Sequence, residues 1–596
     1  MTTITALEDT SWDLDDLVYG DGAAGVDRLL DDALRRAEAL EQNRGKLHEL
    51  DGAALEALMR ELAELSDLIG RAGSYAHLRF AADTTDETRG ALVQKVNERS
   101  TEVQTKLLFF DLEWAALDDQ TAERLLAHEG LGFCRHYLRS QRRYRDHLLS
   151  EPEEKILAEK NVTGGAAWER LFEEHSSAIR VPHGGDELPL EAALSQLQHP
   201  DRDHRRSIAE SVTEGLKPGL RTRAFIFNTL LQDKATNDRL RRYPHWLASR
   251  NLSNEATDES VAALVEAVTS SYGIARRWYD LKARLLGIDK LADYDRMAPV
   301  TGDDEEVPWE EATTIVLDGY RSFSPELADL CSQFFDGRWI DAPMRPGKRT
   351  GAFCSYTVPS HHPYVMLNYT SRRRDVLTLA HELGHGVHAA LARPQGIFHH
   401  STPLTLAETA SVFGETVVFG RLLEMADTPA SRLSLLAENV EGAIATVFRQ
   451  IAMNRFEDRV HTARRTEGEL AVERLNELWE QAQESMFGDS VEVTPGYRTW
   501  WSYIPHFIGA PGYVYAYAYG QLLALSVYKR YEEQGPSFVP RYLDMLSAGG
   551  SLPPEELGAL VDCDLSDPAF WSGGLAIIEG QLAKAEEAAR ADGRIS

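Results

Sequence analysis

The sequence predicts a mainly α-helical fold with one small β-sheet. Long stretches place apolar residues three and four positions apart between charged ones, which is typical of amphipathic helices. The chain of 596 residues has only 43 glycines and 24 prolines, and they fall mostly between these stretches. One short region differs, because it is rich in aromatic and β-branched residues.

The helical pattern is clearest in four stretches. They are Val26–Leu65 (broken near Gly52), Glu123–Asn161, Asp258–Leu286 and Leu433–Arg465. A loop-like run, QHPDRDHRRS, separates helical patterns near residue 200. We therefore expect an N-terminal helical domain over residues 1–200 and a second domain over residues 201–596.

Two strands are predicted in the region that lacks the helical pattern. GAFCSYTVP covers Gly351–Pro359 and PYVMLNYT covers Pro363–Thr370, with prolines bounding the short connection. Such segments are typical of paired strands, so we expect a hairpin at the edge of a small sheet.

Charge and cysteine content narrow the class of protein. The net charge of −31 repels phosphate backbones and anionic lipids, so we expect no nucleic-acid or membrane partner. No run reaches the length of a membrane span, and the acidic N-terminus lacks the order of a signal peptide. The four cysteines are scattered, which predicts free thiols and a cytoplasmic protein.

The segment after the second strand predicts a metal-binding helix. Asp375 is a plausible N-cap, and Pro394 would stop the helix. Within it, His381-Glu382-Leu383-Gly384-His385 forms an H-E-x-x-H motif. Four residues make about one helical turn, so both imidazoles leave the same face and can share one ion. Glu382 can reach a metal-bound water without being a ligand itself.

A catalytic zinc ion usually takes three protein ligands, and the third is expected downstream. A metzincin would need glycine at 388 and histidine at 391, where this chain has His388 and Leu391. Glu408 and Glu415 instead lie seven residues apart in an otherwise apolar helical run. We expect Glu408 to bind the metal and Glu415 to accept a hydrogen bond from a ligating imidazole. The alternative is that both are ordinary surface acids.

These motifs together resemble a known family. HELGHGVH, preceded by PYVMLNY and followed by LAETASVFGE, is similar to the thimet oligopeptidase and oligoendopeptidase F family of zinc peptidases, and most to its bacterial oligoendopeptidase F branch. The opening SWDLDDLVYG and the late HFIGAPGYVYAY also resemble that branch. The resemblance implies a two-lobed helical zincin that encloses a deep substrate channel, with residues 1–200 as its lid or wall and one zinc ion per chain.

The resemblance also implies that a C-terminal segment completes the site. The matching positions are His506, Tyr513 and Tyr517. In a helix, Tyr513 and Tyr517 would share one face and Tyr515 and Tyr519 the next, so that one pair faces the substrate and the other the core. We expect His506 and Tyr513 to be catalytic and Tyr517 to bind substrate.

Three further positions are expected to contact substrate. The family pairs the substrate backbone with a sheet edge, and Gly351 and Ala352 are small enough for close approach at the first strand. His388 lies on the same helix face as His385 and can touch the substrate, although a core histidine is an equal alternative.

The predicted activity is zinc-assisted hydrolysis of short unfolded peptides by an intracellular metalloendopeptidase. Water bound to the ion is the nucleophile, and Glu382 is the general base. Two alternatives remain: a zinc carboxypeptidase on a related scaffold, and a catalytically silent peptide-binding protein. The sequence leaves open the cleavage preference, the length limit of the peptide, the physiological substrate and the oligomeric state.

Overall fold

The computed structural model describes residues 6–300 and 306–595 and confirms a mainly helical fold with small sheets. The chain forms two compact units, each built from three segments. The first comprises residues 1–145, 304–424 and 527–564, and the second comprises residues 146–303, 425–526 and 565–596. This division differs in kind from a boundary near residue 200, which stays a prediction.

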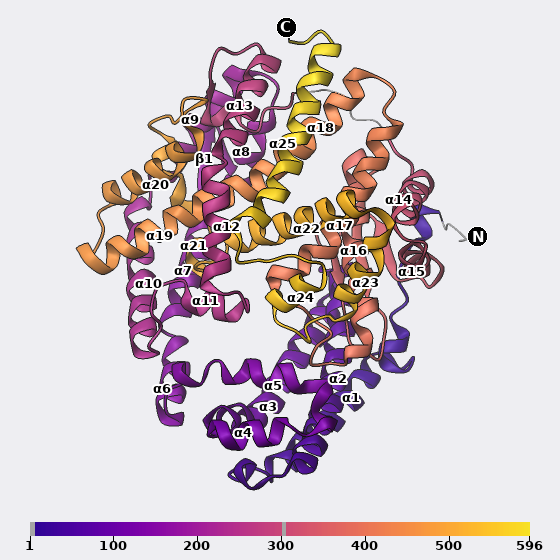
Figure 1. Ribbon diagram of the computed structural model, residues 1–596. Helices are drawn as coiled ribbons and strands as arrows, with labels where there is room; N and C mark the ends of the chain where they lie inside the picture. The colour runs from indigo at the N-terminus through magenta and orange to yellow at the C-terminus, as the bar shows by residue number, and fades with distance from the viewer. Residues whose placement is uncertain (1–5, 301–305, 596) are drawn as a thin grey trace. The chain divides into compact units, whose positions relative to one another are not determined.

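The first unit begins with three long helices that pack together: α1 (Gly22–Glu41), α2 (Gly52–Ala82) and α3 (Glu87–Ala116) (Figure 1). Their shared core contains Met59, Phe110 and Trp114. The predicted break near Gly52 is confirmed, and Gly52 itself begins α2, because the Asp51 carboxylate accepts the Ala54 N–H at 2.8 Å as an N-cap. The stretch from residue 123 to 161, expected as one helical region, is divided among α4 (Asp119–Leu126), α5 (Arg135–Arg142) and α6 (Glu151–Asn161).

A three-stranded sheet follows in the same unit. Its order is β4 (Ile340–Pro343), β6 (Tyr364–Tyr369) and β5 (Phe353–Ser355). β5 and β6 pair antiparallel, as predicted, and β5 is the edge strand. β4 pairs parallel with β6 and was not predicted, because four fully buried residues show no alternation.

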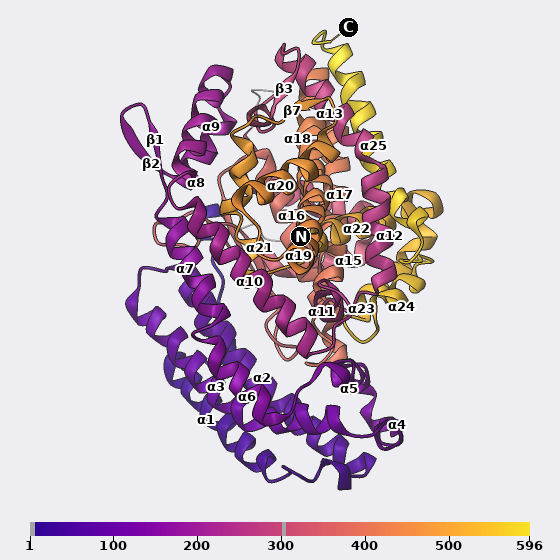
Figure 2. The ribbon, with the colours of Figure 1, turned by 90° about the vertical axis from the view of Figure 1, so that its left-hand side faces the viewer.

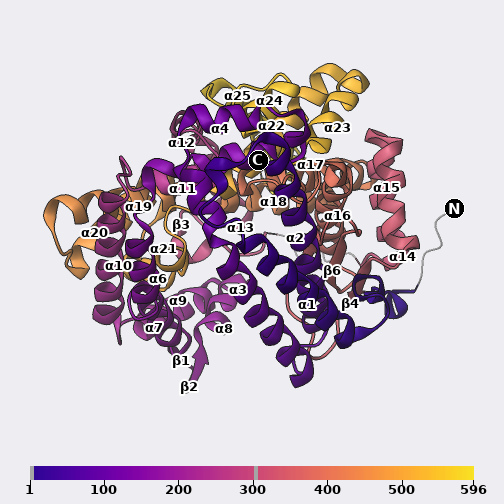
Figure 3. The same cartoon turned by 90° about the horizontal axis from the view of Figure 1, so that it is seen from below.

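Helices of the first unit cover this sheet. α16 (Arg373–Ala392) packs against β5, β6, α14 (Trp309–Phe323) and α15 (Pro325–Asp336) (Figure 3). α17 (Leu404–Met425), α23 (Val539–Ser547) and α24 (Pro554–Leu560) complete the unit.

The start of α16 corrects one prediction. Arg372, not Asp375, is the N-cap residue. Asp375 is the third residue of the helix, and its carboxylate accepts the N–H groups of Thr370 and Arg372 at 2.7 and 3.2 Å. An acid at this position satisfies the cap from inside the helix, which the one-dimensional pattern does not distinguish from capping itself. Pro394 lies in the short turn Arg393–Gln395 that ends the helix, as predicted.

The second unit starts with α6 and α7 (Gly165–Ser177). A hairpin of β1 (Arg180–His183) and β2 (Asp186–Pro189) leads through α8 (Leu190–Ser195) to α9 (Arg202–Leu216), against which it packs (Figure 2). α10 (Leu220–Leu240), α11 (Ala248–Ser253), α12 (Asp258–Ser270) and α13 (Tyr272–Leu286) follow. The predicted helical stretch 258–286 is therefore confirmed, except that Ser271 interrupts it.

Its later segments supply the rest of the core. α18 (Pro429–Ala443) continues through one π-helical turn into α19 (Arg449–Glu467), as expected for residues 433–465. α25 (Pro568–Ala591) packs along α18 and α12 (Figure 1), and α20 (Val472–Phe487) packs on α19. The short strands β3 (Leu291–Ala292) and β7 (Val491–Glu492) pair in parallel. α21 (His506–Gly509) precedes α22 (Tyr515–Gln534).

Within residues 6–300 and 306–595, no helix combines the length and the hydropathy that crossing a membrane requires. All four cysteines are free, as predicted, and three of them are buried.

Candidate metal centre and active site

The site is built where α16 and α17 touch. Gly384 makes this contact possible, because a Cβ atom there would stand 2.5 Å from the Ala410 carbonyl oxygen and 2.6 Å from the Ser411 Cα. Only a glycine lets the two backbones approach so closely. The face of α16 that carries Gly384 therefore lies against the start of α17.

This contact brings His381, His385 and Glu408 together. One ligand atom from each lies within 4.8 Å of the other two. His381 Nε2 is 3.3 Å and His385 Nε2 is 3.6 Å from the same Glu408 oxygen, Oε2. The two imidazole rings are 5.0 Å apart at an angle of 81°, so both face one point from one turn of helix.

Neighbouring side chains orient this group. The Glu415 carboxylate lies 3.1 Å from His381 Nδ1, so Nδ1–H donates to it and Nε2 is left for a ligand. Ser411 Oγ donates to Glu408 Oε2 at 2.7 Å. The Tyr320 hydroxyl of α14 donates to the Ala380 carbonyl at 2.8 Å and ties the start of the motif to the unit's interior. The predicted geometry of Glu415 is thus present.

Glu382 points into the same space. A cavity of about 440 Å³ is lined by both imidazoles, by Glu382 and Glu408, and by residues 352–354, 356, 401, 402 and 407. The Cys354 backbone N–H donates to the Glu382 carboxylate. Burial raises the pKa of Glu382 to about 7, with the neighbouring His381 opposing the rise and Glu408 adding to it. A carboxyl group with such a pKa can both take and release a proton near neutrality.

The other charges depend on the acids around the motif. Burial works to lower the pKa of His381, but the hydrogen bonds and charges of Glu408 and Glu415 outweigh it and raise the pKa to about 10. Burial lowers the pKa of His385 to about 4. Glu408 is partly buried, which works to raise its pKa, yet the hydrogen bond and charge of His381 and the charge of His385 lower that pKa to about 2. Without an ion, one imidazolium and one carboxylate therefore share the centre.

The donor set fits a zinc ion. Two imidazoles and one carboxylate are a ligand set of catalytic zinc sites. No lysine or arginine is among the described residues that line the cavity, so without an ion the positive charge beside its acids comes from the proton on His381. A divalent cation would displace the proton of His381 and supply that charge.

Several functional neighbours escaped the sequence analysis. Phe353, Cys354 and Tyr356 line the cavity together with Ala352, and no spacing rule in the sequence indicates this set. The Tyr356 hydroxyl and Thr402 Oγ1 are buried, and neither has a hydrogen-bond partner within the part of the chain that the structure describes. Ser411 lies three residues after Glu408 on the same helix. Side chains at this spacing lie next to each other on a helix, so the contact could have been predicted from the sequence.

The three expected substrate contacts are placed differently. Ala352 lines the cavity, but β5 begins only at Phe353. Gly351 precedes the strand at φ +83°, which favours glycine, and its carbonyl accepts from Asn368 Nδ2 at 2.8 Å. His388 is 3% exposed and does not line the cavity. As substrate contacts, all three stay predictions.

The residues expected from the C-terminal segment form a cluster in the second unit. His506 Nε2 lies 3.2 Å from the Tyr517 hydroxyl. The Tyr513 ring lies 6.1 Å from the His506 ring and 5.0 Å from the Tyr517 ring. Burial lowers the pKa of His506, so this imidazole is neutral at neutral pH. Tyr515 and Tyr519 are buried, whereas Tyr513 and Tyr517 are partly exposed. Tyr513 precedes α22, which begins at Tyr515, so Tyr513 and Tyr517 do not share a helix face as expected.

Comparison with known proteins decides the family. The model of peptidase family M3 matches residues 195–576, and the model described as oligopeptidase F matches residues 113–180. The chain belongs to peptidase family M3. This M3 peptidase is 26% identical to oligopeptidase PepF of Bacillus subtilis over 92% of its own length and 83% of that protein's. It is 25% identical to an oligoendopeptidase F homolog of Lactococcus lactis, over 91% of each chain.

Solved structures show the same fold. A crystallised protein from Chlamydophila abortus has a TM-score of 0.88 at 23% identity, covering 98% of the M3 peptidase and all of that chain. Oligoendopeptidase F from Enterococcus faecium has a TM-score of 0.71 at 23% identity, covering 94% and 98%. The chain is therefore a metallopeptidase of the oligopeptidase F type, as the sequence predicts, and its His–His–Glu group is consistent with the metal site of this zinc peptidase family.

Proposed function

We propose that this M3 peptidase is a zinc metalloendopeptidase that cleaves short unfolded peptides in the cytoplasm. His381, His385 and Glu408 hold one zinc ion, and Glu382 moves the proton. The observation that carries the proposal is the convergence of two imidazoles and a carboxylate within 4.8 Å, beside Glu382 in one cavity. When bound, a zinc ion polarises the scissile carbonyl and lowers the pKa of water towards neutrality.

Glu382 performs the proton transfers in this mechanism. Its carboxylate takes a proton from the attacking water and later delivers that proton to the leaving amine nitrogen. Burial supports this role, because it raises the pKa to about 7, close to the operating pH. The Cys354 N–H fixes the carboxylate in place for both transfers. Glu415 keeps His381 oriented by accepting its Nδ1–H.

His506 and Tyr513 are the proposed donors to the oxyanion that develops at the scissile carbonyl, and Tyr517 is proposed to bind substrate. Supporting this, all three belong to one cluster in which the Tyr517 hydroxyl and His506 Nε2 are 3.2 Å apart. A neutral imidazole and a phenol are donors that cost little to bring near a peptide and gain strength as charge develops.

Substrate binding is proposed at β5. This strand lies at the edge of its sheet, and an extended peptide can add to such an edge. Ala352 leaves room for the peptide backbone at the cavity, and Gly351 and His388 are proposed as further substrate contacts. The limit to short unfolded peptides depends on the deep channel that the family resemblance implies, which stays a prediction.

Cytoplasmic location is supported by the cysteines. All four are free, and burial raises the pKa of Cys134 to about 12 and of Cys563 to about 11. Unpaired thiols of this kind are typical of a reducing compartment. Cell fractionation followed by detection of the protein tests this assignment, and recovery outside the cytoplasm would contradict it.

The deciding experiment compares wild type, Glu382→Gln and Glu424→Gln. Glu424 is a control on α17 with 72% of its side chain exposed. We expect one zinc ion in each protein, full activity for the control, and a loss of about 10²–10⁴-fold in kcat for Glu382→Gln. The substrate is an internally quenched peptide blocked at both ends, so that only an endopeptidase cleaves it. Full activity of Glu382→Gln, or cleavage restricted to free C-termini, would overturn the proposal.

A further inference from the structure

Glu457 of α19 holds the turn that carries Tyr513. The backbone N–H of Gly512 donates to Glu457 Oε1 at 2.8 Å. Gly512 is buried and has φ +74°, so the turn needs both a glycine and a partner for its N–H. On the preceding residue of the same helix, the Phe456 ring packs 5.1 Å from the ring of Phe507, the neighbour of His506. Adjacent residues of α19 thus support both halves of the His506–Tyr513 cluster.

The turn is also contacted by α11 and by Leu247, the residue before that helix. Arg250 Nε donates to the Pro511 carbonyl at 3.3 Å, and its guanidinium lies 6.0 Å from the centre of the Tyr513 ring. A Cβ atom at Gly512 would stand 2.6 Å from Leu247 Cδ1, so the Leu247 side chain contacts the turn directly.

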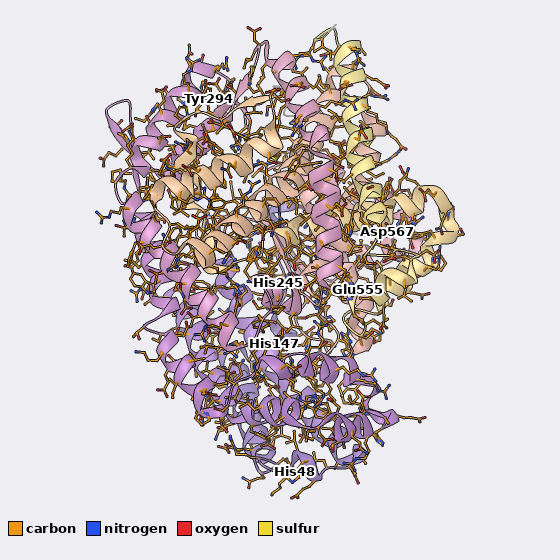
Figure 4. The ribbon with its side chains drawn as sticks, turned by 60° about the vertical axis from the view of Figure 1, so that its left-hand side comes forward. His48, His147, His245, Tyr294, Glu555 and Asp567 are labelled. Atoms are coloured by element: carbon orange, nitrogen blue, oxygen red, sulfur yellow. The ribbon has the colours of Figure 1, made fainter. Side chains whose placement is uncertain are left out.

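The segment around the start of α11 is itself held by hydrogen bonds. His245, labelled in Figure 4, pairs with Asp258 at 2.8 Å, and Asn251 Nδ2 donates to the other Asp258 oxygen at 2.7 Å. The turn is therefore contacted by two elements, α11 and α19, and on α19 it is Glu457 that accepts the hydrogen bond.

Keeping a carboxyl group at this place is costly. Glu457 is 1% exposed, and its second oxygen, Oε2, has no hydrogen-bond partner among the described residues. Burial raises its pKa to about 8, although the Gly512 N–H and the charges of Arg250 and Arg455 oppose the rise. An apolar side chain would avoid this desolvation, at the expense of the bond to Gly512. Such a conflict between stability and local structure is expected near functional residues.

We propose that Glu457 is a positioning residue for the reaction: by accepting the Gly512 N–H it sets the place of Tyr513 as an oxyanion donor. This inference rests on the proposed role of Tyr513 and extends it to Glu457, which acts through the turn that carries Tyr513 and does not itself contact the substrate. Without the acceptor, the Gly512 N–H is buried and unpaired, so the turn moves to satisfy it and carries Tyr513 with it.

The test compares Glu457→Gln with Glu457→Met in the full-length zinc-loaded enzyme. Glutamine keeps an acceptor oxygen at the same reach, whereas methionine has similar length and no strong acceptor. We expect Glu457→Met to lower kcat by about 10–100-fold with KM nearly unchanged, because displacement of about 1 Å at a reacting group has that effect. Glu457→Gln should restore most of kcat, and zinc content should be the same in all variants, because the ligands lie in the other unit.

Combination with Tyr513→Phe separates positioning from a general structural defect. If Glu457 acts through Tyr513, then Glu457→Met lowers kcat little further in the Tyr513→Phe background. Equal losses in both backgrounds, wild-type kcat for Glu457→Met, or a Glu457→Gln variant as slow as Glu457→Met would each overturn the proposal. If Glu457→Met is not obtained folded, Glu457→Asp takes its place, since the shorter side chain withdraws the acceptor and should also lower kcat.

Failure of the underlying function is recognised separately. Wild-type kcat for Tyr513→Phe would refute the role of Tyr513 itself, and with it any positioning by Glu457. A slow Tyr513→Phe enzyme together with a normal Glu457→Met enzyme would instead leave Tyr513 in its role and refute only the inference about Glu457.

Discussion

Replacing Gly384 with alanine should separate the metal ligands. The added methyl group would stand 2.5 Å from the Ala410 carbonyl oxygen and 2.6 Å from the Ser411 Cα. Nonbonded carbon atoms prefer about 3.5–4.0 Å, so the shortfall is roughly 1 Å. Both obstacles are backbone atoms of α17, and no side-chain rotation relieves them.

The strain has two measurable consequences. Overpacking of this kind costs about 1–3 kcal/mol of the free energy of unfolding. Because α16 carries His381 and His385 while α17 carries Glu408, moving the helices apart by about 1 Å also spoils the shared ligand point, and misplacement on that scale lowers catalysis by about 10²-fold. The effect on zinc affinity should be of similar size, since three ligands no longer meet one ion.

Gly420→Ala on α17 is the matched control. Nothing lies within 4 Å of a Cβ atom at Gly420, and alanine in a helix interior is favoured over glycine by about 0.5–1 kcal/mol. The assay is competition for zinc with a chromophoric chelator, followed by turnover of a quenched peptide at saturating zinc. Gly384→Ala with wild-type zinc affinity and turnover would refute the reasoning, because the ligands would then not depend on the closeness of α16 and α17.

Three further predictions concern the metal centre and the core. Glu415→Ala should lower zinc affinity by about 10–100-fold. Glu415→Gln should lower it less, because the amide oxygen still accepts the hydrogen bond from His381 Nδ1. Equal zinc affinities of the two variants and the wild type in a chelator titration would contradict this prediction. Zinc affinity should fall about tenfold for each pH unit as the pH is lowered from about 8 to 6, because the ion must displace a proton from His381, whose pKa is about 10 without metal. Competition with a chelator over this pH range measures the slope. A zinc affinity that does not change with pH would contradict the prediction. Arg205→Met should cost about 3 kcal/mol of the free energy of unfolding in urea, since it leaves Asp295 buried with Arg202 as its remaining ionic partner. Arg206→Met breaks an exposed ion pair and should cost almost nothing. Similar losses of unfolding free energy for the two variants would contradict the stabilising role of the buried pair.

Short-range features of the site were predictable from the sequence. The four-residue spacing of His381 and His385 places both rings on one face of any α-helix, and the seven-residue spacing of Glu408 and Glu415 does the same two turns apart. Helical geometry is the same in every fold, so these relations needed no tertiary information.

Relations across long sequence distances were not predictable in this way. Nothing local shows that Gly384 touches Ala410, that Cys354 donates to Glu382, or that Glu457 meets Gly512. Each depends on how whole helices pack, and packing selects among many pairings that have equal local propensity. β4 was missed for a related reason, because a strand buried on both faces has no alternation to detect.

By itself, then, the sequence determined the helical character, the metal-binding motif, the third ligand candidate and the family, since each depends on spacing within one element or on a motif. The tertiary structure decided which backbone contacts hold those ligands at one point, where the edge strand lies beside Glu382, and which side chains behind the tyrosines fix their turn. It also decided that two compact units are assembled from interleaved segments of chain. The physical reason is that helix geometry follows from local covalent structure, whereas packing is set by burial summed over residues that are distant in sequence.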